Sequence, residues 1–347
     1  MPSQLGLFYV CPPKKTGIEQ FSAAIVPKET ISGGIGLNDF DPARIQAVVR
    51  TRILMHRSSR FLKPVPHWLV ALGLLIALWT PLQSAPETSK AGADPEAHEA
   101  LLAIVEREKT LQHLDEMAQM GRNTQKEFES TAAGILEDYS CWVEQHPDAI
   151  LGRILYGKLL VKLDMKEKAH QQFLAANKID PHVAVVNQQL GNHAAEKGDY
   201  SEAFFHLRKA CFLDPDAAPY HYQLGELIYT YKNPLVLNRD LSISEAEELM
   251  MSSFQKATEL APDVRDFAMR HAEAYFDLLN PDWNEALAKW DHLLESTDNL
   301  FERDVIRLRK AQVLAKLKRF LEARELAESV TQEALQEARE SILAGLP

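Results

Sequence analysis

Residue types that carry catalytic or metal chemistry occur in this chain but form no recognisable site. The sequence holds twelve histidines and three cysteines, the side chains that often bind transition metals or act as bases and nucleophiles. His193, His206 and His221 do not recur at a ligand spacing on one helix. No G-x-S-x-G, glycine-rich phosphate loop, H-E-x-x-H or C-x-x-C motif is present. We therefore expect no catalytic, cofactor or metal site, and an exported enzyme with an irregular active site is kept as an alternative.

Prolines and glycines recur instead at a fixed interval. Three prolines and three glycines share this spacing: Pro147, Pro181, Pro215, Gly157, Gly191 and Gly225. Their period, about 34 residues, is typical of stacked supersecondary units. Proline cannot continue a helix and suits the first turn of the next one, so each proline is expected at a repeat boundary.

The residues between the prolines predict paired helices. Gly191 and Ala203 are small, which allows the two helices of one unit to approach closely. Leu190 and Leu207 are expected to fill the space around that contact. The chain is therefore predicted to be all-α, a stack of antiparallel helix pairs.

This pattern resembles the tetratricopeptide repeat (TPR) family, which implies a right-handed superhelical solenoid of antiparallel helix pairs. The matching residues in the two clearest units are Tyr156, Gly157, Ala169, Phe173, Ala176 and Pro181, then Leu190, Gly191, Ala203, Leu207, Ala210 and Pro215. Arg153 and Asn187 stand where the family usually has tryptophan.

The period divides the rest of the chain into successive units. We expect an N-terminal helical cap or degenerate repeat at 95–149, repeats at 150–183, 184–217 and 218–263, a degenerate repeat at 264–299, and a degenerate repeat with a C-terminal cap at 300–347. Pro215 and Pro262 are 47 residues apart, so the third repeat contains an insertion of about 13 residues. We place it near 233–245, between the paired helices, and expect the fold to tolerate its deletion. Met250 replaces the small alanine of this pair, which predicts looser packing.

Charge is distributed unevenly along the sequence. The formal net charge of the whole chain is -11. Residues 1–63 include nine basic and four acidic residues, and residues 64–347 include 29 basic and 45 acidic residues. An acidic body repels nucleic acid and anionic lipid surfaces, so we expect no nucleic-acid partner.

An apolar segment follows the basic residues. Trp68–Trp79 is uncharged, and five Lys or Arg residues lie between 50 and 63. This length fits a secretory signal better than the roughly 20 residues of a membrane span. We expect residues 64–85 to be a signal-peptide region or a retained membrane anchor, 86–94 a linker, and the body exported to the periplasm or cell envelope. A buried helix of a soluble domain is the third alternative.

Residues 1–63 are expected to be a basic, disordered leader. Met55 begins a stretch that already has the form of a complete signal-peptide leader. The true start is therefore expected at Met55, with a disordered cytoplasmic tail as the alternative.

The resemblance also implies a partner-binding groove, formed by inward-facing positions of each first helix. On this chain those positions are Leu151, Ile154, Lys158, Val161, Val185, Gln188, Asn192, Ala195, Pro219, Tyr222, Glu226 and Tyr229. Tyr222 and Tyr229 point the same way, two helical turns apart. They form either a binding hot spot or a contact with the next repeat or the inserted loop. Gln188 and Glu226 replace basic residues of the family's carboxylate-binding groove, which disfavours capture of a free C-terminus.

Together these features predict a non-enzymatic scaffold. It would bind a peptide or helix of a protein partner on its concave face, in an envelope assembly or secretion machine. A structural or self-assembling envelope component is the alternative, and the sequence defines neither the partner nor the oligomeric state.

Overall fold

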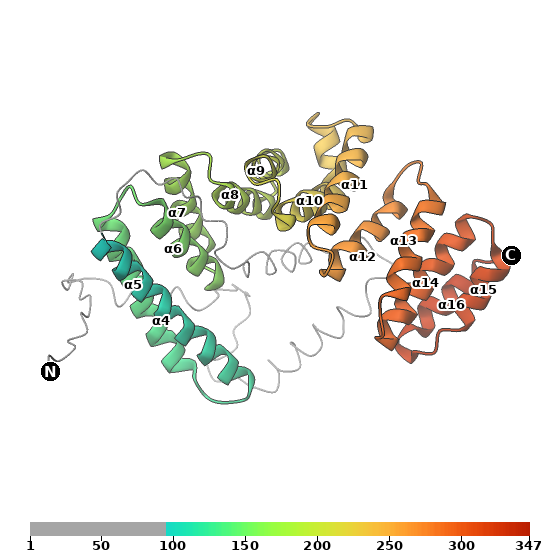
Figure 1. Ribbon diagram of the computed structural model, residues 1–347, viewed down its shortest axis with the longest axis horizontal. Helices are drawn as coiled ribbons and strands as arrows, with labels where there is room; N and C mark the ends of the chain where they lie inside the picture. The colour runs from blue at the N-terminus through green and yellow to red at the C-terminus, as the bar shows by residue number, and fades with distance from the viewer. Residues whose placement is uncertain (1–94) are drawn as a thin grey trace, which may run out of the picture. The chain divides into compact units, whose positions relative to one another are not determined.

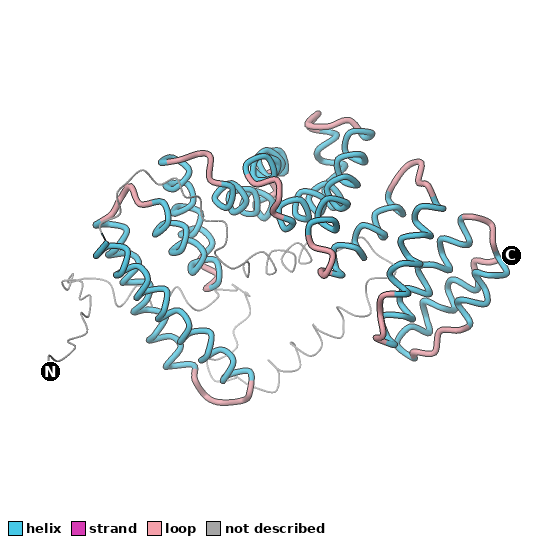
Figure 2. The backbone as a smooth tube through the Cα atoms, in the orientation of Figure 1, coloured by secondary structure: helices cyan, strands magenta, loops and turns pink. Residues whose placement is uncertain are grey.

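The structure, a computed structural model, describes residues 95–347, and these residues form only helices and connecting segments (Figure 2). The expected leader, apolar segment and linker lie outside the described residues. The described chain divides into two compact units, 95–213 and 214–347. Each unit is a helical solenoid of antiparallel helix pairs, which confirms the all-α class.

The first unit contains three helix pairs. Its helices are α4 (Pro95–Gln119), α5 (Gln125–Gln145), α6 (Ile150–Lys162), α7 (Lys166–Ile179), α8 (Ala184–Lys197) and α9 (Tyr200–Leu213), coloured from blue-green to yellow-green in Figure 1. The predicted repeat ranges 150–183 and 184–217 hold the α6–α7 and α8–α9 pairs.

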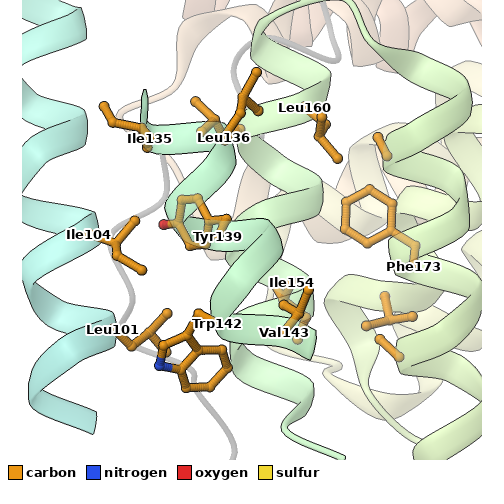
Figure 3. Close-up of a cluster of buried hydrophobic side chains, with 14 of the residues drawn as sticks. Leu101, Ile104, Ile135, Leu136, Tyr139, Trp142, Val143, Ile154, Leu160 and Phe173 are labelled. Carbon is orange, nitrogen blue, oxygen red and sulfur yellow. The ribbon is translucent and has the colours of Figure 1, made fainter. Parts of the chain in front are cut away.

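Buried side chains from successive helices form one core in this unit. Leu101 of α4, Trp142 of α5, Ile154 of α6 and Phe173 of α7 belong to the same cluster (Figure 3). The Trp142 indole N–H donates a hydrogen bond to the Ala97 carbonyl, 3.1 Å away, so this core also fixes α4 on α5. The predicted cap, 95–149, is thus continuous with the first repeat.

The recurring glycines lie where a large side chain of the second helix meets the first. A Cβ atom on Gly191 would lie 2.9 Å from Leu207 Cγ, and one on Gly225 would lie 2.7 Å from Phe254 Cε1. A Cβ on Gly191 would also lie 3.2 Å from the Ala203 carbonyl oxygen, whereas the three atoms nearest to one on Gly225 all belong to the Phe254 ring. Met250 is itself buried, and the looser packing of its pair stays a prediction.

We predict that Gly191→Leu destabilises the first unit by about 1–3 kcal/mol, because the new side chain overlaps Leu207 and approaches the Ala203 carbonyl. Thermal unfolding followed by circular dichroism measures the effect. Gln171→Leu, which adds leucine at an exposed position of α7, is the control. An unchanged melting temperature for Gly191→Leu would show that the two helices do not need this close approach.

The second unit continues the same arrangement. Its helices are α10 (Ala218–Leu237), α11 (Ile243–Leu260), α12 (Arg265–Ala274), η3 (Tyr275–Asp277), α13 (Trp283–Glu295), α14 (Leu300–Lys316), α15 (Phe320–Glu328), η4 (Glu333–Leu335) and α16 (Gln336–Ala344). The short α16 packs against α14 and α15. The backbone N–H groups of Thr331 and Gln332 donate to the Asp304 carboxylate, which fixes the turn before this last helix.

The inserted residues lengthen both helices of the third repeat. α10 has 20 residues and α11 has 18, against 13 or 14 in each helix from α6 to α9. Leu235 is fully buried, and Lys232 Nζ bonds to Glu247 of α11 and to the Asp277 carbonyl. The expected placement between the helices is corrected, because residues 233–237 belong to α10 and 243–245 to α11. Burial of Leu235 also argues against a dispensable insertion.

Deletion of residues 233–245 is now expected to lower the stability of the second unit and to broaden its unfolding transition. The deletion removes buried Leu235 and the Ser242–Glu245 capping box that begins α11. Hydrogen exchange of α10 and α11 measures the effect. Leu237→Ser, at an exposed position of the same segment, should leave exchange unchanged. Cooperative unfolding of the deletion variant would contradict this assignment.

Candidate partner-binding surface

The first unit presents the predicted inward positions of α6 and α8. Its partly exposed members are Leu151, Lys158, Val161, Val185 and Asn192, and its buried members are Ile154, Gln188 and Ala195. The exposed part therefore combines apolar surface with one ammonium group and one amide. Such a surface can hold an apolar side chain and hydrogen-bond to a peptide backbone.

Two predicted site residues of this unit, Lys158 and Gln188, differ in how far they are accessible to a partner. Burial lowers the pKa of Lys158, the nearby Lys162 lowers it further, and Glu108 opposes the shift. The Gln188 carboxamide oxygen accepts a hydrogen bond from Gln189 Nε2, 3.0 Å away. Gln188 is thus held inside the helix pair, whereas Lys158 and Asn192 remain partly accessible for a partner.

In the second unit, the predicted site residues of α10 contact other parts of the same unit. The Tyr222 ring stacks on Phe267 of α12, with ring centroids 4.5 Å apart, and contacts Phe254 of α11. The Tyr229 ring lies edge-on to Phe254. Burial raises the pKa of both tyrosines. Tyr222 thus packs against the next repeat and Tyr229 against α11 of its own repeat. Both tyrosines are partly exposed, and their role as a binding hot spot stays a prediction.

Glu226, the third predicted residue of α10, is also engaged. Its carboxylate pairs with Arg270 Nε of α12 at 2.5 Å, and its side chain is only 13% exposed. Burial raises the pKa of Glu226, and the guanidinium of Arg270 opposes that increase. The predicted use of Glu226 as an open groove residue does not fit these contacts.

The sequence interpretation missed two arginines that organise this face. Arg270 of α12 pairs with Glu226 of α10 and also with Glu273, at 3.1 Å. Arg309 of α14 repeats the arrangement, because it pairs with Glu273 at 3.3 Å and donates to Gln312. Each arginine thus links the first helix of its own repeat to the first helix of the preceding one.

Aromatic rings complete the same arrangement. The Arg270 guanidinium lies over the Tyr229 ring at 4.8 Å, and that of Arg309 lies over Phe276 at 5.7 Å. Arg270 and Arg309 each stand two residues before a buried alanine, Ala272 or Ala311. This shared position, two residues before the alanine, was the sequence signal that could have identified the two arginines. We call Glu226, Arg270, Glu273 and Arg309 the charge ladder.

Several histidines in the described part of the chain are packed against neighbouring side chains. The His206 ring bonds to Asn187 and Glu202, and the rings of His170 and His193 stack 3.9 Å apart. Between residues 95 and 347, no group of three or more His, Cys, Asp or Glu residues could hold a metal ion. No helix in the same range is long and apolar enough to cross a membrane.

Comparison with known proteins gives structural likenesses only. No family model matches the chain, and no curated protein matches it significantly. YrrB, described as a TPR protein with an unusual peptide-binding site, is 18% identical, with a TM-score of 0.48 over 60% of this chain and 96% of that one. PilF of Pseudomonas aeruginosa is 15% identical, with a TM-score of 0.46 over 71% and 99%. TTC0263, a TPR protein of Thermus thermophilus, is 18% identical, with a TM-score of 0.36 over 56% and 100%. These likenesses assign no function to the chain.

Proposed function

We propose that this protein is an exported, non-enzymatic scaffold that binds a peptide or helix of a partner protein in the cell envelope. The observation that carries the proposal is the inward surface of α6 and α8, where Lys158 and Asn192 stay partly accessible among apolar residues. Regular stacks of helix pairs present such surfaces on rigid elements, which suits recognition of an extended segment.

The proposed site is smaller than the sequence suggested. It consists of Leu151, Lys158, Val161, Val185 and Asn192, all in the first unit. Tyr222, Glu226 and Tyr229 are left out because their rings and carboxylate already contact α11 and α12. A partner that paired with Glu226 would have to displace its ion pair with Arg270, and displacing a buried ion pair is costly.

Site-specific cross-linking tests the binding surface. A photoreactive amino acid at position 192 should cross-link a partner in living cells, and one at Lys126, an exposed residue of α5, should not. Lys158→Glu is expected to reduce the cross-link at position 192, because an acidic side chain changes the charge of the surface. Equal cross-linking at 126 and 192, or no effect of Lys158→Glu, would contradict the proposed site.

The proposed location in the cell envelope is supported by the basic residues and the apolar segment before residue 86. Protease added to intact cells with a permeabilised outer layer should digest the body, and N-terminal sequencing of the purified protein should show whether the segment is cleaved. Full protection of the body from protease under these conditions would reject export.

A further inference from the structure

The second helices of the first unit carry exposed side chains at positions that the repeat makes equivalent. On α9 these are Phe205, Arg208 and Phe212, and one repeat earlier, on α7, they are Gln171, Leu174 and Lys178. All six are exposed. Equivalent positions of neighbouring repeats lie side by side on one face, with helix axes about 10 Å apart. We call these six residues the outer face.

The outer face has large apolar side chains that are exposed to solvent. Phe212 is 83% exposed, Phe205 56% and Leu174 47%. The α9 residues lie at i, i+3 and i+7, so they share one side of that helix. Elsewhere the first unit buries its aromatic residues, as in the cluster around Trp142 and Phe173. Clustered exposed apolar side chains of this kind mark interaction surfaces.

The charged members of the outer face are all cationic. Lys178 and Arg208 lie in no ion pair among residues 95–347, and the neighbouring Lys209 ammonium lies 5.9 Å from the centre of the Phe205 ring. Glu202, the acidic residue of α9, bonds to His206, and Asp180 and Asp214 follow just after α7 and α9. The six residues of the outer face carry two positive charges and no negative charge, on a chain with 45 acidic and 29 basic residues after residue 63.

We infer that the outer face binds an acidic amphipathic helix of a partner protein. Carboxylates of such a helix would meet Lys178 and Arg208, and its apolar side chains at i, i+3 and i+7 would cover Leu174, Phe205 and Phe212. The outer face lies on α7 and α9, the second helices of their pairs, whereas the inward residues lie on the first helices, α6 and α8. It therefore adds a second binding site to the scaffold.

The charge distribution favours a helix over an anionic bilayer. Charges interact over about 8–10 Å at physiological salt, roughly the diameter of one helix. A bound helix therefore interacts mainly with the charges on and beside the outer face. A bilayer is much wider and would also meet the acidic remainder of the body, which repels it.

Binding of designed peptides to the full chain tests the inference. The probe is a fluorescent amphipathic peptide with leucine on one side and glutamate on the other, long enough to form a helix by itself. A matched peptide has lysine in place of every glutamate. At low salt the acidic peptide is expected to bind at least tenfold more tightly than the lysine peptide, and this preference should decrease as salt is added.

Two sets of variants locate the binding. Phe205→Ser with Phe212→Ser, and separately Lys178→Glu with Arg208→Glu, should each weaken acidic-peptide binding at least tenfold. The control, Leu300→Ser on α14 with Leu321→Ser on α15, also removes exposed apolar side chains and should not. Circular dichroism should be unchanged in all three, since every substituted side chain is largely exposed.

Several outcomes would overturn the inference. One is equal binding of the two peptides, and another is binding that the outer-face variants do not change. Binding to vesicles of phosphatidylglycerol and phosphatidylcholine that is lost in these variants would assign the face to a membrane. A rise of molar mass with protein concentration that the variants abolish would assign it to a second copy of the chain. Lys126→Glu, at an exposed position of α5 outside both surfaces, should leave peptide binding intact. The cross-link at position 192 reports on the inward site, so failure here is separate from failure of that site.

Discussion

Gly152→Ala is expected to destabilise the first unit by about 3 kcal/mol, a large effect for a single methyl group. A Cβ atom at this position of α6 would lie 2.0 Å from Trp142 Cζ3 and 2.5 Å from Cε3. The indole cannot easily move away, because its N–H is bonded to the Ala97 carbonyl and its ring lies within the core shown in Figure 3. The methyl group must therefore shift α5 or α6.

Hydrogen exchange along α4 to α7 measures this destabilisation locally. Gly134→Ala in α5 is the matched control, because its new Cβ would meet only the flexible end of Arg107, and alanine favours a helix over glycine by up to about 1 kcal/mol. Trp142→Ala alone should cost about 3–5 kcal/mol. Combined with Gly152→Ala, it should cost clearly less than the sum of the two, since the clash disappears with the ring. Additive losses would show that the ring is not what excludes a side chain at 152.

Most of the helix pairs could be predicted from the repeat period, because the effect of its prolines and small residues depends on their immediate surroundings. Proline interrupts helices wherever it stands, and a small residue such as Gly191 is needed wherever two helices come close, so both report on structure without knowledge of distant contacts. The paired helices at 150–179 and 184–213 follow from these residues alone.

The insertion shows where local signals fail. Its Pro, Asn and Asp residues are typical of a loop, yet α10 runs through Pro234 to Leu237. Tyr231 has a non-helical backbone, with φ -121° and ψ 26°, and this kink separates the proline from the helix before it. Burial of Leu235 then stabilises the extension. Only the tertiary contact makes this helical continuation favourable.

The candidate site was predicted in part for a related reason. The family pattern assigned Tyr222, Glu226 and Tyr229 to one face of α10, but it could not show which of them contact the next repeat. That depends on Phe267 and Arg270, which belong to the following repeat. Ion pairs between repeats leave no periodic signal unless both repeats carry the same residues, and the two arginines of the charge ladder occur in the most degenerate repeats.

Arg270→Met is expected to destabilise the second unit by about 3–5 kcal/mol. The substitution keeps much of the side-chain volume but leaves the Glu226 carboxylate buried without its guanidinium partner. It also removes the ion pair with Glu273 and the contact with the Tyr229 ring. Arg319→Met, at the start of α15, is the control: its partner Glu322 is about half exposed, so the melting temperature should hardly change.

The loss of stability that Arg270→Met causes in the second unit should depend on pH. Burial already raises the pKa of Glu226 above its ordinary value, and loss of Arg270 removes the charge that opposes this increase. A carboxyl group whose pKa is higher in the folded state binds protons more readily when folded, so lowering the pH favours folding. The stability of the variant relative to the native chain is therefore expected to recover as pH falls from 7 toward 5.

A second substitution separates the charge from the other contacts. Glu226→Gln in the Arg270→Met background removes the unpaired charge, so it should restore part of the lost stability at pH 7 and abolish most of the recovery at lower pH. Hydrogen exchange of α10 and α12 at pH 5 and 7, corrected for the intrinsic exchange rate, measures both effects. If Arg270→Met is equally destabilised at both pH values, or if Glu226→Gln gives no rescue, the charge ladder does not hold these repeats together through the Glu226–Arg270 pair.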